Sequence, residues 1–78
     1  MTHIGNKIRV LREQRDMSKP ELADVLGVTV PAIHHIERGF RKPSLPLLIK
    51  MADFFGESVE DLARISAEDD AAIAIPTP

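Results

Sequence analysis

The sequence predicts an all-α domain of five short helices. Apolar residues recur at helical spacing along most of the chain, and no segment shows the strict alternation of a half-buried strand. Ser18, Thr29, Ser44 and Ser58 each precede one of these segments, where a hydroxyl oxygen can accept a hydrogen bond from a free backbone amide. A chain of 78 residues, 44% hydrophobic and 28% charged, has the size and composition of one folded domain.

The first helix is expected at about residues 5–15. Ile4, Ile8 and Leu11 are spaced i, i+4, i+7, so they share one face of a helix that ends near Arg15.

The second helix is expected at about residues 19–26. Ser18 and Glu21 have the spacing of a capping box, in which each side chain bonds the backbone amide of the other residue. Pro20 is tolerated in the first turn, because the amide it lacks has no partner inside a helix, and Gly27 favours a stop.

The third helix repeats this arrangement. Thr29 caps it, Pro31 lies in its first turn and Gly39 ends it, at about residues 30–38. Ile33 and Ile36 are expected to face the core.

The last two helices begin after Ser44 and Ser58. The first of them has Pro46 in its first turn, ends at Gly56 and is expected to bury a stripe made of Leu45, Leu48, Ala52 and Phe55. The second has Asp61 three residues after its serine and is expected to be short, with Val59 and Leu62. The folded domain is therefore expected over residues 1–65. Residues 66–78 are acidic, then small and apolar, then closed by two prolines, which predicts a flexible tail.

Cysteine and charge restrict the classes of function. Without cysteine the chain forms no disulfide or thiolate metal site, and without a signal-like or membrane-spanning apolar run it is expected in the cytoplasm, away from membranes. The net charge of −2 conceals an asymmetry: residues 1–50 contain nine Lys or Arg against five acids, and residues 51–78 contain one against seven. A basic first half is compatible with a nucleic-acid partner.

Residues 18–39 form the most informative stretch. Two short helices joined by a tight link containing a glycine cross steeply, so the second projects outward in a way that fits a major groove. The framework over about residues 5–62, and above all Ile33-His-His-Ile36-Glu37-Arg38-Gly39 followed by Arg41-Lys42-Pro43-Ser44-Leu45, resembles the Cro/C1-type (XRE-type) helix-turn-helix family. The resemblance implies a five-helix lambda-repressor-like DNA-binding domain that acts as a transcriptional regulator. A repressor is preferred to an activator, because occupancy of a promoter is the simplest output of such a domain.

By this resemblance the third helix reads DNA bases. The implied base-reading residues are Val30, Pro31, Ala32, His34 and His35. Many relatives have Gln, Ser, Arg or Lys near the start of this helix, whereas the first three residues here cannot donate side-chain hydrogen bonds. Methyl groups can still pack on the thymine methyl group, which predicts modest specificity for each half-site.

Other residues are expected to hold the DNA backbone or to position the helix. The candidate phosphate-binding residues are Lys19, Thr29, Arg38, Arg41 and Lys42. The alternative is that the charged side chains among them only keep the surface soluble. Arg12 and Glu37 match a family pair that bridges the first helix to the end of the third.

No catalytic, metal or cofactor site is expected. The serines are explained as helix caps, and the acids show neither a calcium loop nor a carboxylate cleft. His34 and His35 diverge by about 100° around a helix, so they do not easily share a metal ion.

The expected partners are double-stranded DNA and a second copy of the chain, because one short helix reads few base pairs. Candidate dimer contacts are Leu47, Phe54, Val59 and Ile65, aided by Ile73 and Ile75. The alternative function is an antitoxin or a protein-interaction adaptor that binds a protein partner through the tail.

Overall fold

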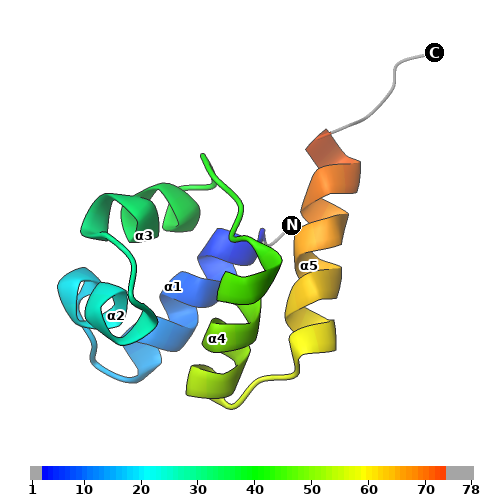
Figure 1. Cartoon of the computed structure of the whole chain (residues 1–78). Coiled ribbons are helices and arrows are strands. Elements are labelled where there is room, and N and C mark those ends of the chain that lie inside the picture. Colours follow the sequence, from blue (N-terminus) through cyan, green and yellow to red (C-terminus); the bar gives the residue numbers. More distant parts are fainter. Residues whose placement is uncertain (1–2, 74–78) are drawn as a thin grey trace.

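The computed structural model describes the backbone of residues 3–73 and the side chains of residues 3–68. The helices are α1 (Ile4–Gln14), α2 (Lys19–Leu26), α3 (Val30–Glu37), α4 (Leu45–Phe55) and α5 (Val59–Ile73). No strand occurs within the described range, so the predicted all-α class is confirmed. In Figure 1, α2 and α3 lie on one side of α1, while α4 and α5 lie on the other.

The predicted caps are present at the start of the helices. Ser18 and Glu21 form the reciprocal capping box, with a bond of 2.8 Å from the Ser18 amide to the Glu21 carboxylate. This bond lowers the pKa of Glu21 below its usual range, because it favours the charged carboxylate. The hydroxyl oxygens of Thr29, Ser44 and Ser58 likewise accept from amides three residues later.

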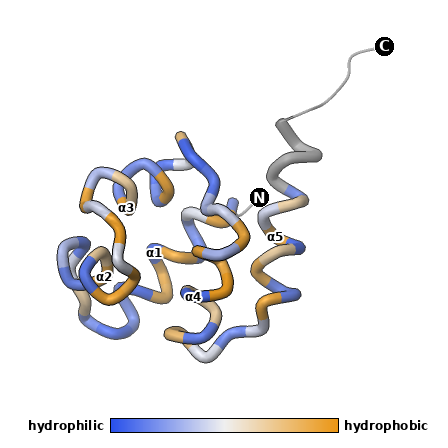
Figure 2. The backbone as a smooth tube through the Cα atoms, viewed as in Figure 1, coloured by the Kyte–Doolittle hydropathy of each residue, from blue (hydrophilic) through white to orange (hydrophobic). Residues whose placement is uncertain are grey.

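The core lies where all five helices meet. Apolar and polar stretches alternate along the helices in Figure 2, and each helix contributes to one buried cluster. Its members are Ile4, Ile8, Leu11, Leu22, Ala23, Leu26, Ile33, Ile36, Leu48, Met51, Ala52, Phe55 and Leu62.

Leu45 departs from the expected core stripe, because 59% of its surface is exposed. It is the first residue of α4, and α4 buries Leu48, Met51, Ala52 and Phe55 instead. Helical spacing places Leu45 near Leu48, but burial requires a second element against that end of the helix.

α5 is longer than the sequence suggested. It continues past Ser66 to Ile73, and its last turns extend beyond the rest of the domain in Figure 1. No glycine or proline interrupts the chain between Gly56 and Pro76, so no strong stop signal is present there. The predicted tail residues 74–78, including Ile75, lie outside the described residues, as does the side chain of Ile73.

None of the helices in the described part of the chain has both the length and the apolar character required to cross a membrane.

Candidate nucleic-acid interface

The turn between α2 and α3 has the geometry of a tight helix-to-helix link. Gly27 ends α2 with φ of 71°, a left-handed conformation that glycine adopts without steric cost. The Val28 amide donates to the carbonyl oxygen of Ala23 at 3.0 Å, which closes the end of α2. Only Val28 then separates this glycine from Thr29, the cap of α3, so the two helices are joined with little freedom.

α3 has one buried face and one outward face. Ile33 and Ile36 are fully or almost fully buried, with 0% and 1% of their surface exposed. Val30, Pro31 and His35 are exposed, and His34 is half-buried. The structure therefore brings four of the five predicted base-reading residues onto one accessible side of the helix.

Ala32 does not lie on this accessible side. Only 8% of its surface is exposed, and its amide donates to the Thr29 hydroxyl at 3.2 Å. The sequence suggested a methyl contact with a base, but the methyl group of Ala32 faces the interior. Its burial depends on the helices packed against α3, which the apolar spacing along the sequence did not determine.

Arg12 and Glu37 form the predicted pair between α1 and the last turn of α3. The guanidinium donates twice to the carboxylate, through Nε at 2.7 Å and through Nη2 at 3.1 Å. Its Nη1 also donates to the carbonyl oxygen of Met17 at 2.7 Å. Both residues are buried, and the hydrogen bond to Glu37 raises the pKa of Arg12 above its ordinary value. The pair thus ties three segments together: α1, the last turn of α3 and the link at Met17.

Gly5 is a structural residue that the sequence reasoning missed. It lies in the first turn of α1, where that helix crosses the end of α3. A Cβ atom at Gly5 would stand 1.8 Å from the carbonyl oxygen of Ile36. The only sequence signal was a glycine inside an amphipathic helix, which is unfavourable unless a close contact requires it.

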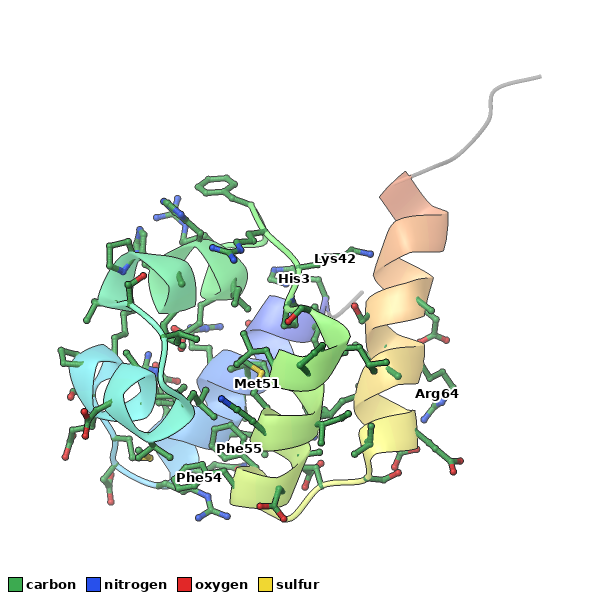
Figure 3. The ribbon with its side chains drawn as sticks, viewed as in Figure 1. His3, Lys42, Met51, Phe54, Phe55 and Arg64 are labelled. Atoms are coloured by element: carbon green, nitrogen blue, oxygen red, sulfur yellow. The ribbon has the colours of Figure 1, made fainter. Side chains whose placement is uncertain are left out.

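The predicted phosphate-binding residues separate into two groups. Lys19, Arg38 and Arg41 belong to α2, the end of α3 and the loop that follows, and the last two are exposed. Thr29 is exposed, and its hydroxyl hydrogen stays available while its oxygen caps α3. Lys42 instead donates to the carbonyl oxygen of Ser66 at 2.7 Å, and Figure 3 shows its side chain directed toward α5.

Phe40 is a second residue that the sequence reasoning missed. It lies three residues past Glu37, the end of α3, with 72% of its surface exposed, and its amide donates to the carbonyl oxygen of His35 at 2.9 Å. Its ring lies 6.4 Å from the His35 ring, and the Arg38 guanidinium lies over it at 5.5 Å. The signal available in the sequence was an apolar residue just after a helix-ending glycine. Phe40 extends the outward surface of α3 beyond the end of the helix.

The residues predicted to form the dimer contact are partly buried within their own domain. Leu47, Phe54, Val59 and Ile65 are half-buried and pack against the core. The guanidinium of Arg15 lies 5.1 Å from the centre of the Phe54 ring. Figure 3 labels Phe54 near the lower end of α4. The more exposed apolar residues of α4 are Leu45 and Ile49, at 59% and 48%.

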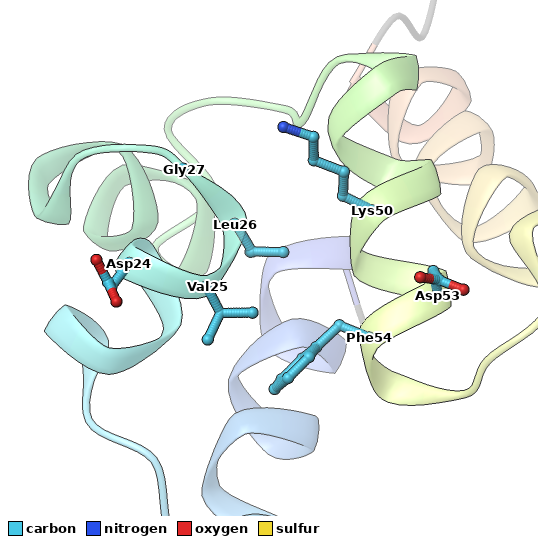
Figure 4. Close-up of a pocket in the computed structure, with 7 residues that line it drawn as sticks. All are labelled: Asp24, Val25, Leu26, Gly27, Lys50, Asp53 and Phe54. Atoms are coloured by element: carbon cyan, nitrogen blue, oxygen red, sulfur yellow. The ribbon is translucent and has the colours of Figure 1, made fainter.

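Two open hollows of the described part of the chain lie near the predicted site residues or between neighbouring helices. One, of about 390 Å³, lies between α2 and α4 and is shown in Figure 4, where it is lined by Asp24, Val25, Leu26, Gly27, Lys50, Asp53 and Phe54. The other, of about 410 Å³, is polar and lies beside the Arg12–Glu37 pair, where it is lined by His3, Asn6, Arg9, Arg12, Glu13, Lys19, Glu37 and Arg38. The described residues contain no group of three or more side chains of the types that commonly hold a metal ion.

Comparison with known proteins yields three informative similarities. An uncharacterized HTH-type transcriptional regulator of Methanocaldococcus jannaschii is 40% identical over 57 residues, which cover 73% of this chain and 86% of that protein. The cryptic phage CTXphi transcriptional repressor RstR of Vibrio cholerae is 35% identical, covering 80% of this chain and 56% of that protein. The structure of Pseudomonas aeruginosa antitoxin HigA with the higBA promoter has a TM-score of 0.86 at 27% identity, covering 94% of this chain and 80% of that one.

Other relatives are much longer than this chain. The chain spans only 28% of the length of three mycobacterial HTH-type regulators to which it is 36% identical. A family model described as helix-turn-helix matches residues 8–62, which include all of α2, the turn and α3. Because this match extends over most of the sequence, the chain belongs to the Cro/C1-type helix-turn-helix family.

Proposed function

We propose that this protein is a sequence-specific DNA-binding transcriptional regulator that acts as a repressor by placing α3 in the major groove. The observation that carries the proposal is the division of α3 into a buried face, with Ile33 and Ile36, and an accessible face. Cationic residues from α2 and from the end of α3 flank the accessible face. A protruding short helix with such flanks matches the shape and charge of the major groove.

The proposed base-reading residues are Val30, Pro31, His34 and His35. Val30 and Pro31 offer apolar contacts to a thymine methyl group, while the imidazoles offer hydrogen bonds. Phe40 continues this surface, next to His35. A promoter-bound relative and a phage repressor among the similar proteins support this use of the fold.

Arg41 and Lys42 provide a matched pair of variants for the phosphate contacts. We expect Arg41→Ala to reduce the slope of log K against log salt by about 0.9, the change for one lost phosphate contact. Lys42→Ala is expected to leave the slope unchanged and to lower the free energy of unfolding by about 1–2 kcal/mol, since it removes the bond to Ser66. Salt titrations of binding and urea unfolding separate the two effects, and equal slopes for both variants would contradict these assignments.

The experiment that tests the function is fluorescence anisotropy with DNA from upstream of the protein's own gene. Excess unrelated DNA is the competitor, and the salt concentration is varied. Selective binding with a steep salt dependence is expected. If that DNA is not selected, the same protein is tested on a random-sequence duplex pool, and failure to enrich any sequence would reject the proposal.

We propose that DNA binding involves a dimer on a palindromic operator. An eight-residue recognition helix reads few base pairs, so two copies are needed for a selective site. Leu45 and Ile49, four residues apart on α4, join the half-buried Leu47, Phe54, Val59 and Ile65 as contact candidates. Light scattering at tens of micromolar is expected to show a dimer, alone or with DNA. A monomeric mass in both conditions would remove this part of the proposal.

An antitoxin role is the second candidate, favoured by the likeness to antitoxin HigA. A tail-dependent antitoxin loses its protein partner when the tail is removed, whereas a regulator keeps its DNA binding. The truncation is best made after Ile73, because α5 continues to that residue and Ser66 accepts the hydrogen bond of Lys42.

A further inference from the structure

Lys19 and His34 are linked by a side-chain hydrogen bond between α2 and α3. The Lys19 Nζ atom lies 3.0 Å from the His34 Nδ1 atom, and both residues are half-buried. An ammonium group can donate hydrogen bonds but cannot accept them. The Nδ1 atom must therefore be the acceptor, which leaves the hydrogen of the neutral ring on Nε2.

The charges around His34 favour the neutral ring. Lys19 is the main cause of a pKa below the usual value, followed by partial burial and by Arg38 and His35, while Glu37 opposes the shift. The bond to Lys19 requires a neutral ring, because a protonated imidazole has no free nitrogen lone pair to accept a hydrogen bond. Within the described part of the chain, no residue accepts a hydrogen bond from the remaining Nε2–H group.

We propose that Lys19 fixes His34 as the Nε2–H tautomer, so that α3 presents a hydrogen-bond donor that excludes cytosine from one position of the operator. Guanine, adenine and thymine each offer an acceptor in the major groove, whereas the hydrogen-bonding group of cytosine there is a donor. The opposite tautomer would accept at Nε2 and lose this discrimination. The inference rests on the proposed function, because it assigns a base preference to the same helix.

Lys19 is thus a positioning residue for His34 as well as a phosphate candidate. The ammonium carries three hydrogens, and His34 uses one of them. The other two remain for a DNA phosphate near the start of α2. A single lysine can therefore fix the position of the DNA backbone and the hydrogen-bonding character of a base-reading side chain together.

The first test concerns the ring itself and needs no DNA. Imidazole ¹⁵N and ¹H spectra of the full chain are recorded over a pH titration for the wild type, Lys19→Met and Lys19→Arg. We expect the wild type to show an unprotonated Nδ1 and a His34 midpoint below 6.5. Lys19→Met is expected to raise the midpoint and to mix the tautomers, and Lys19→Arg to preserve both. A wild-type ring with the hydrogen on Nδ1, or spectra unchanged by Lys19→Met, would overturn the inference.

The second test measures base preference. Each variant selects from a random-sequence duplex library, and the bound fraction is sequenced. The wild type is expected to deplete cytosine about fivefold at one position, the effect of one net hydrogen bond. Lys19→Met and His34→Gln are expected to remove this depletion, while Lys19→Arg keeps it. Lys50→Met is the control, since it removes one exposed charge from α4 and should keep the preference.

The outcomes distinguish this inference from the proposed function. Selective binding with the same base preference in wild type and Lys19→Met would reject the tautomer mechanism and leave the DNA-binding function standing. If the library yields no enriched sequence, both the proposed function and the base preference fail, and the spectra then report only a structural contact between the two side chains.

Discussion

Gly5→Ala is expected to destabilise the domain by about 3 kcal/mol or more, at the upper end of what overpacking costs. The added Cβ would lie 1.8 Å from the carbonyl oxygen of Ile36 and 2.8 Å from its carbon, and both are backbone atoms that no rotamer change can move. In an ordinary helix interior the same change would stabilise by about 1 kcal/mol. The sign of the measured effect therefore decides whether α1 and α3 touch here.

Urea and thermal unfolding followed by circular dichroism measure this effect. A domain of this size loses about 4–8 °C in Tm for each kcal/mol, so the expected decrease exceeds 10 °C. Gly56→Ala is the matched control: its φ is 69°, but its Cβ would meet nothing within 4 Å. That control carries only the left-handed backbone cost of about 1–2 kcal/mol. A Gly5→Ala protein as stable as the wild type would contradict the packing described for α1.

Glu37→Ala is expected to cost about 3–5 kcal/mol of stability, because it leaves the guanidinium of Arg12 buried without its carboxylate. We expect operator affinity to decrease as well, since the last turn of α3 loses its connection to α1. Unfolding curves and anisotropy on the selected operator measure the two effects. Unchanged affinity would contradict the positioning role of the pair.

A double variant separates stability from positioning. Replacing Arg12 with Met and Glu37 with Leu removes both charges and fills the space with apolar groups, a change that is often neutral or stabilising for a buried pair. The lost bond to the Met17 carbonyl oxygen is expected to cost about 1 kcal/mol. If this protein is nearly as stable as the wild type but still binds DNA weakly, the pair orients α3. Recovery of affinity together with stability would assign it a purely structural role.

The sequence alone determined the features that depend on near neighbours in the chain. Ser18 and Glu21 are three residues apart, so their capping box forms whenever that turn is helical. The inward faces of α1 and α3 followed from apolar spacing in the same way, as Ile8 and Ile33 illustrate. The Arg12–Glu37 contact was available only through the family resemblance, because 25 residues separate its members.

The tertiary structure decided the features that depend on which element lies opposite a residue. The family resemblance suggested that Ala32 faces outward, and helical spacing suggested that Leu45 faces the core. The structure shows the reverse, because neighbouring helices cover Ala32 and leave Leu45 exposed. Lys42 contacts α5 and Lys19 contacts His34 through distances that chain order does not specify. Local hydrogen bonding and periodicity therefore define the helices of this protein, whereas the packing between helices selects the side chains that remain free to meet DNA.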